Sequence, residues 1–137
     1  MNYGLIGCVG LKLPHKAKAK ELYLSDLFKK SLAYCLKNYE KNFILSALYG
    51  VVDLEEEIEP YDLTLNTMPK QLIYVWSEKV FGQLNKILKD GDNVYFHCGE
   101  NYSKFLMYML MRVGVNCHFP LKSLQIGKRK QFYVRNK

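Results

Sequence analysis

Three short apolar runs alternate with three longer amphipathic segments along this chain, and this alternation limits its possible folds more than any other feature. Each run contains β-branched residues, as buried strands do; the runs are 3–9, 43–47 and 94–98. Apolar residues at helical spacing follow each run, from Asp26 to near Asn38, from Pro69 to about Asp90, and from Glu100 to Gly114. Such alternation predicts a three-layer α/β fold, with a mostly parallel sheet and helices on both faces.

The ends of these segments carry start and stop signals. Ser25 precedes the first helix as an N-cap, and Gly114 closes the third. A further strand is expected at 115–119 and an edge strand at 131–134, which gives a sheet of four to five strands. At 137 residues the chain has the size of one compact domain, so we expect a single α/β domain over residues 1–137.

Charge is distributed unevenly along the chain. The formal net charge is +7, from 20 basic and 13 acidic residues, and six of the acids lie between Asp53 and Asp62. The rest of the chain is basic, above all the acid-free end that contains Lys128 and Arg129. This distribution favours a phosphate-bearing partner, a nucleotide or nucleic acid. The alternative is that the lysines only keep the protein in solution.

Several classes of protein are disfavoured. No apolar run approaches the roughly 18 residues that a membrane-spanning helix needs, so we expect a cytoplasmic protein without a membrane partner. The four cysteines lack the spacing of a zinc site or of a secreted disulfide framework, which favours reduced thiols. We therefore expect no metal and no cofactor.

Ligands of open parallel sheets bind beyond the carboxyl ends of the strands. This rule selects three loops, which begin at residues 8, 46 and 98. In the first loop Lys12 is placed to meet a phosphate, and Ser25 begins a helix whose free N–H groups attract anions. A structural turn explains the glycines of this loop equally well, and Cys8 is more typical of a small buried residue than of a nucleophile.

The second loop carries aromatic and acidic residues. Tyr49 and Tyr61 are placed to stack on a base, and Asp62 is placed to bind a sugar hydroxyl or to activate a water. The alternative is two packing tyrosines and a capping aspartate.

The third loop follows a histidine. His97 lies inside the strand, where a core histidine is commoner than a catalytic one. Glu100 falls in the first turn of a helix, where the helix dipole alone also favours a carboxylate. Tyr102 either points into the cleft or packs beneath it.

These loops belong to a longer pattern of residues. It comprises Cys8 with Lys12, Leu22-Tyr-x-Ser25-x-x-Phe28, Ile44-Leu-Ser-Ala-x-Tyr-Gly50, Ile58-x-Pro-Tyr-Asp62-x-x-Leu65, Gly99-Glu-x-Tyr102 and Pro120-Leu-x-x-Leu124-x-Ile-Gly127. The pattern spans nearly the whole chain and resembles an uncharacterised family of small bacterial and phage α/β proteins. Its central piece, Ser-x-x-Tyr-Gly followed by Pro-Tyr, is similar to the peroxide-stress YaaA-like proteins, which are longer and are associated with DNA binding. A more distant resemblance is to the uracil-DNA-glycosylase-like domain of archaeosine-forming tRNA enzymes, although the water-activating and intercalating motifs of true glycosylases are not found here.

The residues and the resemblance together predict a site for a nucleotide or nucleic acid. The candidate catalytic residues are Asp62 and Glu100, and the candidate binding residues are Cys8, Lys12, Tyr23, Ser25, Ser46, Tyr49, Gly50, Tyr61, Tyr102, Lys128 and Arg129. Three functions remain open: an enzyme acting on a nucleobase or N-glycosidic bond, a non-catalytic DNA- or RNA-binding protein, or a phage or defence protein that sequesters a nucleotide signal. The apolar segment 105–111 also leaves a homodimer open.

Overall fold

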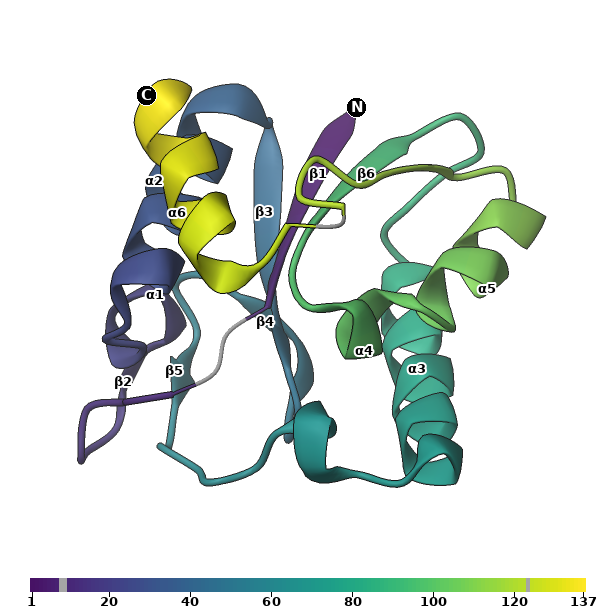
Figure 1. Ribbon diagram of the computed structural model, residues 1–137. Helices are drawn as coiled ribbons and strands as arrows, with labels where there is room; N and C mark the ends of the chain where they lie inside the picture. The colour runs from purple at the N-terminus through teal and green to yellow at the C-terminus, as the bar shows by residue number, and fades with distance from the viewer. Residues whose placement is uncertain (8–9, 123) are drawn as a thin grey trace.

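A five-stranded sheet lies between two layers of helices, as the strand–helix alternation predicts. The computed structural model describes residues 1–7, 10–122 and 124–137. Figure 1 looks nearly along the sheet, with α1, α2 and α6 on one side and α3, α4 and α5 on the other. The α/β fold class with a mostly parallel sheet is therefore confirmed.

The sheet has the strand order β4-β3-β1-β6-β7. Its strands are β1 (Asn2–Gly7), β3 (Lys41–Ser46), β4 (Gly50–Asp53), β6 (Asn93–His97) and β7 (Asn116–His118). All pairings are parallel except that of β3 with β4. The segment after β3 was expected to be a long loop, and this expectation is wrong for its first part. The chain instead turns back at once into the antiparallel edge strand β4, and β5 (Glu57–Ile58) then pairs with β2 (Ala17–Lys18) in a small separate ribbon.

The helices confirm most of the predicted segments and correct three details. They are α1 (Ala19–Leu22), α2 (Asp26–Asn38), the 3-10 turn η1 (Leu65–Thr67), α3 (Lys70–Leu84), α4 (Glu100–Ser103), α5 (Leu106–Arg112) and α6 (Ile126–Arg135). The second predicted helix ends earlier than expected, at Leu84, and the third is divided into α4 and α5. The predicted edge strand at 131–134 is helical, because a short apolar run is compatible with either structure and here only Tyr133 of this run is buried.

Alternate residues of the central strands build two separate cores. Leu5 and Leu45 point to the face covered by α3 and α5, where they pack with residues such as Trp76. Ile6 and Ile44 point to the opposite face, where they pack with residues of α1 and α2. Since both faces of β1 and β3 are buried, these strands are nearly continuous apolar runs rather than alternating ones.

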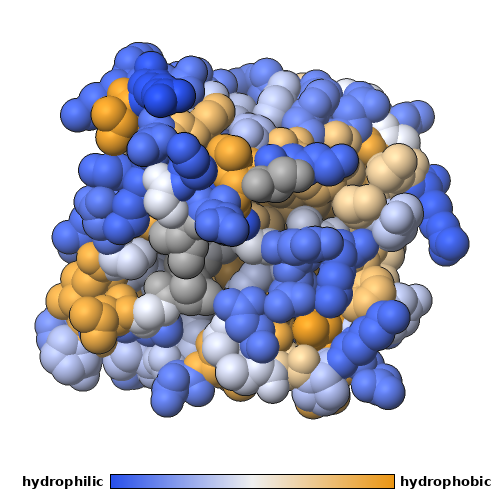
Figure 2. All heavy atoms as spheres, viewed as in Figure 1, coloured by the Kyte–Doolittle hydropathy of each residue, from blue (hydrophilic) through white to orange (hydrophobic). Residues whose placement is uncertain are grey.

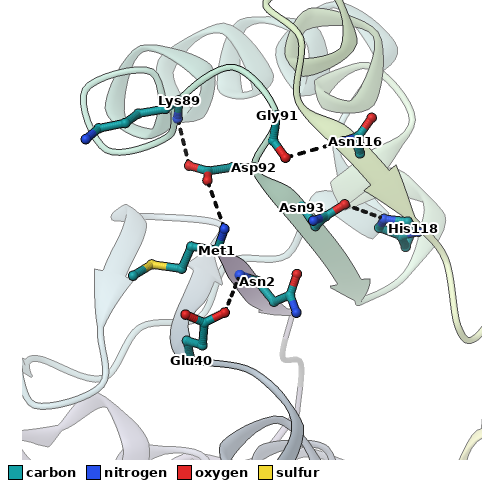
Figure 3. Close-up of polar contacts among 9 residues, drawn as sticks. All are labelled: Met1, Asn2, Glu40, Lys89, Gly91, Asp92, Asn93, Asn116 and His118. Carbon is teal, nitrogen blue, oxygen red and sulfur yellow. Dashed lines mark hydrogen bonds and ion pairs between the residues drawn. The ribbon is translucent and has the colours of Figure 1, made fainter.

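Polar contacts join the strands at their amino ends (Figure 3). The Asp92 carboxylate accepts hydrogen bonds from the backbone N–H of Lys89 (2.8 Å) and from the amino group of Met1 (3.2 Å). The hydrogen bond from Lys89 and the Met1 charge lower the pKa of Asp92. At β7, the His118 ring lies 3.0 Å from the side-chain oxygen of Asn93. These contacts tie β1, β6 and β7 together at the edge opposite their carboxyl ends.

A buried chain of hydrogen bonds docks α6 against the rest of the molecule. The Tyr133 hydroxyl lies 2.7 Å from Ser31 Oγ on α2 and 2.8 Å from His97 Nδ1 on β6. His97 Nε2 in turn lies 2.7 Å from the Tyr39 hydroxyl. Burial lowers the pKa of His97 from its usual 6.5 to about 4, so the ring is neutral at pH 7. One tyrosine hydroxyl therefore donates to the ring and the other accepts from it.

Among the residues that the structure describes, no helix has the length and apolar character needed to cross a bilayer.

His97 makes the stability of the fold depend on pH. Its pKa is lower in the folded than in the unfolded chain, so the unfolded chain binds more protons between pH 6.5 and 4. The contribution of His97 is therefore complete above pH 6.5 and is lost as the pH falls to about 4, which amounts to about 3 kcal/mol in the free energy of unfolding. Urea denaturation at a series of pH values measures it, and the difference between wild type and His97→Gln isolates the histidine from the carboxylates. A slope in His97→Gln equal to that of wild type would contradict this assignment.

Two glycines are expected to respond to alanine in opposite directions. Gly114 ends α5 with φ +83°, and a Cβ there would meet the Asp90 carboxylate; the carboxylate can rotate away, but the backbone strain remains. Gly114→Ala should therefore lower the free energy of unfolding by about 1–2 kcal/mol. Gly82 lies in α3 with open space around its Cβ position, so Gly82→Ala should raise it by about 0.5–1 kcal/mol. Urea denaturation of both variants provides the test, and equal effects of the same sign would contradict it.

Candidate functional site

The order of the strands places a crevice between β1 and β6. From β1 the chain passes through α2 to β3 on one side, and from β3 it returns through α3 to β6 on the other side. The connections leave β1 and β6 toward opposite faces of the sheet, and in folds of this kind ligands bind between two such strands, beyond their carboxyl ends. The first and third of the three predicted loops follow β1 and β6, so the crevice lies where these two loops begin.

A small cavity of about 130 Å³ occupies this crevice, and we call it the inner cavity. The strands contribute Gly7 from β1 and His97 from β6, followed by Cys98 and Gly99. The helices contribute residues that include Ser25, Ser31, Tyr102, Arg129 and Tyr133. The inner cavity is thus lined by residues of β1, α2, η1, β6, α4 and α6, which are far apart in the sequence. Two of these residues, His97 and Tyr133, belong to the hydrogen-bonded chain that docks α6.

A larger depression of about 690 Å³ adjoins the inner cavity, and we call it the outer groove. The two share Cys98, Leu121 and Arg129. The basic residues of the outer groove are Lys70, Lys104, Lys122 and Arg129, and Glu100 is its one acidic residue among those that the structure describes. Its aromatic residues are Phe96, Phe105, Tyr108 and Phe119. The outer groove therefore combines an excess of positive charge with aromatic walls.

Local contacts hold several of these side chains in place. The guanidinium Nε of Arg129 donates to the carbonyl oxygen of Leu124 at 2.9 Å, which fixes the side chain beside the junction of cavity and groove. The Lys104 ammonium donates to Asn101 Oδ1 at 3.0 Å and lies 5.4 Å from the centre of the Phe105 ring. Two of the groove's four cations, Arg129 and Lys104, are therefore held in position by hydrogen bonds.

Four of the residues predicted from the sequence lie around this crevice. Ser25 caps α2, with Oγ accepting the N–H of Phe28 at 3.1 Å. Tyr102 is only 2% exposed; its ring packs edge-on against Trp76 and also borders the inner cavity. Glu100 is exposed in the first turn of α4, at the outer groove, and Arg129 lies where groove and cavity meet.

Four other predicted residues form a separate cluster. The Lys12 ammonium lies 4.4 Å from the centre of the Tyr61 ring and 5.7 Å from that of Tyr23. The hydroxyls of Tyr23 and Tyr61 are 2.7 Å apart, and Tyr49 packs edge-on against Tyr61. These residues line neither the inner cavity nor the outer groove. Lys12 is therefore directed at tyrosine rings, and the predicted stacking residues are engaged with one another.

Ser46 and Gly50 belong to the tight turn between β3 and β4. Ser46 Oγ accepts the N–H groups of Leu48 (3.2 Å) and Tyr49 (3.0 Å), and the Ser46 carbonyl accepts the indole N–H of Trp76 at 2.9 Å. Gly50 has φ +80°, which is the conformation that favours glycine. Both residues thus shape a turn and reach neither the inner cavity nor the outer groove.

The remaining predicted residues lie elsewhere. Asp62 is exposed between β5 and η1 and borders neither the inner cavity nor the outer groove, so the structure does not bring it together with Glu100 there. Lys128 is exposed on α6. Cys8 lies outside the described residues. Among the residues that are described, no group of three or more His, Cys, Asp or Glu side chains is placed to hold a metal ion.

Several residues of the crevice were not identified from the sequence. Cys98 had been included in the third loop and Ser31 in the first predicted helix, both without a role. Tyr133 had been expected on an edge strand, placed with Phe132 to stack on unpaired bases, and not beside the crevice. Arg129 and Tyr133 are four residues apart, which places them on the same face of a helix, so helical spacing was the signal that could have linked them. Lys122 had been counted only as part of the basic C-terminal end, and Lys70 and Lys104 carried no local signal, because nothing in their neighbourhood distinguishes them from other surface lysines.

Comparison with known proteins identifies relatives but no known structure. The chain is 30% identical over 112 residues to a UPF0246 protein of Rickettsia felis, which covers 71% of this chain and 44% of that protein. It is 31% identical over 130 residues to a UPF0246 protein of Rickettsia conorii (84% and 50%), and 32% identical over 112 residues to one of Rickettsia rickettsii strain Iowa (71% and 44%). The chain thus spans about half the length of the curated relatives it matches, and no solved structure matches it.

These distant homologues confirm the resemblance to YaaA-like proteins, since UPF0246 is the YaaA family. A family profile matches residues 4–135, which is nearly the whole chain. The chain therefore belongs to the family of unknown function DUF6884.

Proposed function

We propose that this protein binds a nucleotide, or one nucleotide unit of a nucleic acid, in the outer groove. The observation that carries the proposal is the combination of four basic side chains with four aromatic ones around a single depression at the carboxyl edge of the sheet. Cations recognise phosphate, and aromatic rings stack on bases; a nucleotide has both groups in one molecule.

The dimensions of the outer groove suit such a ligand. Its volume of about 690 Å³ falls within the range of about 300–1,000 Å³ that is typical of small-molecule sites. The rings of Phe96 and Phe119 stack on each other with centroids 5.1 Å apart and form a rigid wall. Tyr108 is 60% exposed, so much of its side chain is open to a ligand. A base can therefore pack on aromatic surface while its phosphate meets the lysines.

Arg129 connects the outer groove to the inner cavity. Its guanidinium is planar and suited to bidentate contacts with phosphate oxygens, and it lies beside the amino end of α2, where the helix dipole also favours an anion. We therefore assign the phosphate to the junction at Arg129 and the base to the aromatic part of the outer groove.

Glu100 is the carboxylate that this proposal assigns to chemistry on the ligand. It borders the outer groove, whereas Asp62 does not. Hydrolysis of an N-glycosidic bond passes through a transition state with positive charge on the sugar, which a nearby carboxylate stabilises while water adds and the base leaves. The distant resemblance of the sequence to uracil-DNA-glycosylase-like domains also favours this reaction.

Removal of two groove lysines should weaken nucleotide binding. We expect the double variant Lys70→Ala/Lys122→Ala to bind nucleoside monophosphates about tenfold or more weakly than wild type, because two charge-assisted contacts are lost. Isothermal titration calorimetry with the four ribonucleoside and four deoxyribonucleoside monophosphates measures the affinity.

The matched control for this variant is Lys16→Ala/Lys86→Ala. It removes the same charge from exposed positions that do not line the outer groove, and it should bind as wild type does. Equal losses in the two double variants, or no binding of any mononucleotide by wild type, would exclude the outer groove as a nucleotide site.

Replacement of Glu100 should separate catalysis from binding. We expect Glu100→Gln to keep nucleotide affinity within about twofold and to lower base release by about 100-fold or more, because the glutamine cannot supply the carboxylate charge. Chromatography of nucleosides, nucleotides and oligonucleotides incubated with each protein measures the free base, and Asp62→Asn is the control that keeps the wild-type rate. Binding without base release by wild type would refute the hydrolytic step and leave a non-catalytic nucleotide-binding protein.

A further inference from the structure

A second depression, of about 330 Å³, lies between α2 and α6 and is distinct from the outer groove. We call it the α2–α6 groove. Its basic residues are Lys29, Lys30, Lys37 and Lys137, and Asp26 is its one acidic residue among those that the structure describes. Figure 2 shows hydrophilic side chains crowded over α6 and the chain end beside it, at the upper left of the view.

The single acidic residue of this groove is already engaged. The Asp26 carboxylate lies 3.3 Å from the ammonium of Lys30 and 3.9 Å from that of Lys130. It therefore does not offset the charges of Lys29 and Lys37. These two lysines are exposed and lie eight residues apart, which corresponds to about 12 Å along the helix axis. An extended polyanion can reach both, whereas a single phosphate cannot.

Aromatic side chains form the floor between these lysines. Tyr34 and Tyr133 line the α2–α6 groove, and the Tyr34 ring packs against Phe132 with centroids 5.4 Å apart. Tyr34 and Phe132 are each only partly buried. Partly exposed aromatic rings beside a row of cations are typical of surfaces that bind unpaired nucleic acid strands, because every base has a face that can stack.

The α2–α6 groove and the inner cavity lie on either side of one buried residue, Tyr133. Tyr133 borders both this groove and the inner cavity, and α2 contributes residues to both from successive turns. The inner cavity in turn joins the outer groove at Arg129. We propose that a single-stranded nucleic acid runs from the outer groove past Arg129 into the α2–α6 groove, where Lys29 and Lys37 hold its phosphodiester backbone.

This inference rests on the proposed function and names the form of its ligand: a strand rather than a free nucleotide. An acidic protein segment could pair with the lysines, but its carboxylates could not stack on the aromatic rings that line both grooves. The observations therefore favour the nucleic acid, and an acidic polymer becomes an outcome of the test.

The experiment compares ligands of increasing length on full-length protein. Fluorescence anisotropy measures the affinity of labelled single-stranded oligonucleotides of 2 to 12 residues, and calorimetry measures that of a mononucleotide. For wild type we expect affinity to rise steeply with length. For Lys29→Ala/Lys37→Ala we expect at least a tenfold loss for the longest oligonucleotide and no change for the mononucleotide. The salt slope of log affinity should fall by about 1.4, since each lost contact with a single strand contributes about 0.7.

Three results would overturn the inference. The first is a loss of oligonucleotide affinity in the control Lys16→Ala/Lys86→Ala equal to that in Lys29→Ala/Lys37→Ala, which would mean that only net charge matters. The second is an affinity that does not depend on Lys29 and Lys37. The third is displacement of the oligonucleotide by poly-glutamate as effective as that by unlabelled oligonucleotide. The mononucleotide titration reports separately on the proposed function, since failure there leaves the oligonucleotide comparison readable.

Discussion

The parallel pairing of β1 with both β3 and β6 is the constraint on which the rest of the structure depends. A parallel neighbour can be reached only by a crossover that spans the sheet, and β1 has one such neighbour on each side. Right-handed crossovers to opposite sides place α2 on one face and α3 on the other, which buries residues 3–6 of β1 and opens the crevice at its carboxyl end. The position of the inner cavity thus follows from the strand order, and the sequence determines which side chains line it.

The docking of α6 brings two of the side chains that line the inner cavity, Arg129 and Tyr133, into place. Tyr133 holds α6 to α2 and β6 through Ser31 and neutral His97, and Arg129 sits one turn earlier on the same helix. Since both ring nitrogens of His97 face tyrosine hydroxyls, the histidine contributes to the crevice by positioning α6 rather than as a general base. The buried hydrogen-bonded chain therefore also fixes the position of Arg129, because both depend on how α6 is docked.

The fold was largely predictable from the sequence because strand and helix periodicities are local. The Phe28, Leu32 and Cys35 spacing gave α2 within a residue, together with its Ser25 cap. The candidate site was less predictable because it depends on how loops fold back. Tyr49, Tyr61 and Lys12 were expected at the crevice since their loops follow strands. Tyr49 instead lies in the tight turn from β3 into β4 and packs on Tyr61, whose ring also faces the Lys12 ammonium. Arg129 and Lys128 of α6 were predicted as binding residues, but the segment 131–134 was assigned to a strand, because its short apolar run fits a strand and a helix equally well.

The distribution of charge in space differs from that along the chain, and the difference supports our proposal that the carboxyl edge and the α2–α6 side bind the ligand. The acidic stretch lies in the β4–β5 region, where Glu55 pairs with Lys18 and Lys20, and Asp53 pairs with Lys41. The lysines early in the chain are thereby partly neutralised, although the sequence alone had made them equal candidates for phosphate contact. Among the described residues, the outer groove and the α2–α6 groove each keep four basic side chains against one acidic one. Under the proposed function, this excess of positive charge would steer a polyanion to the side where the aromatic grooves lie.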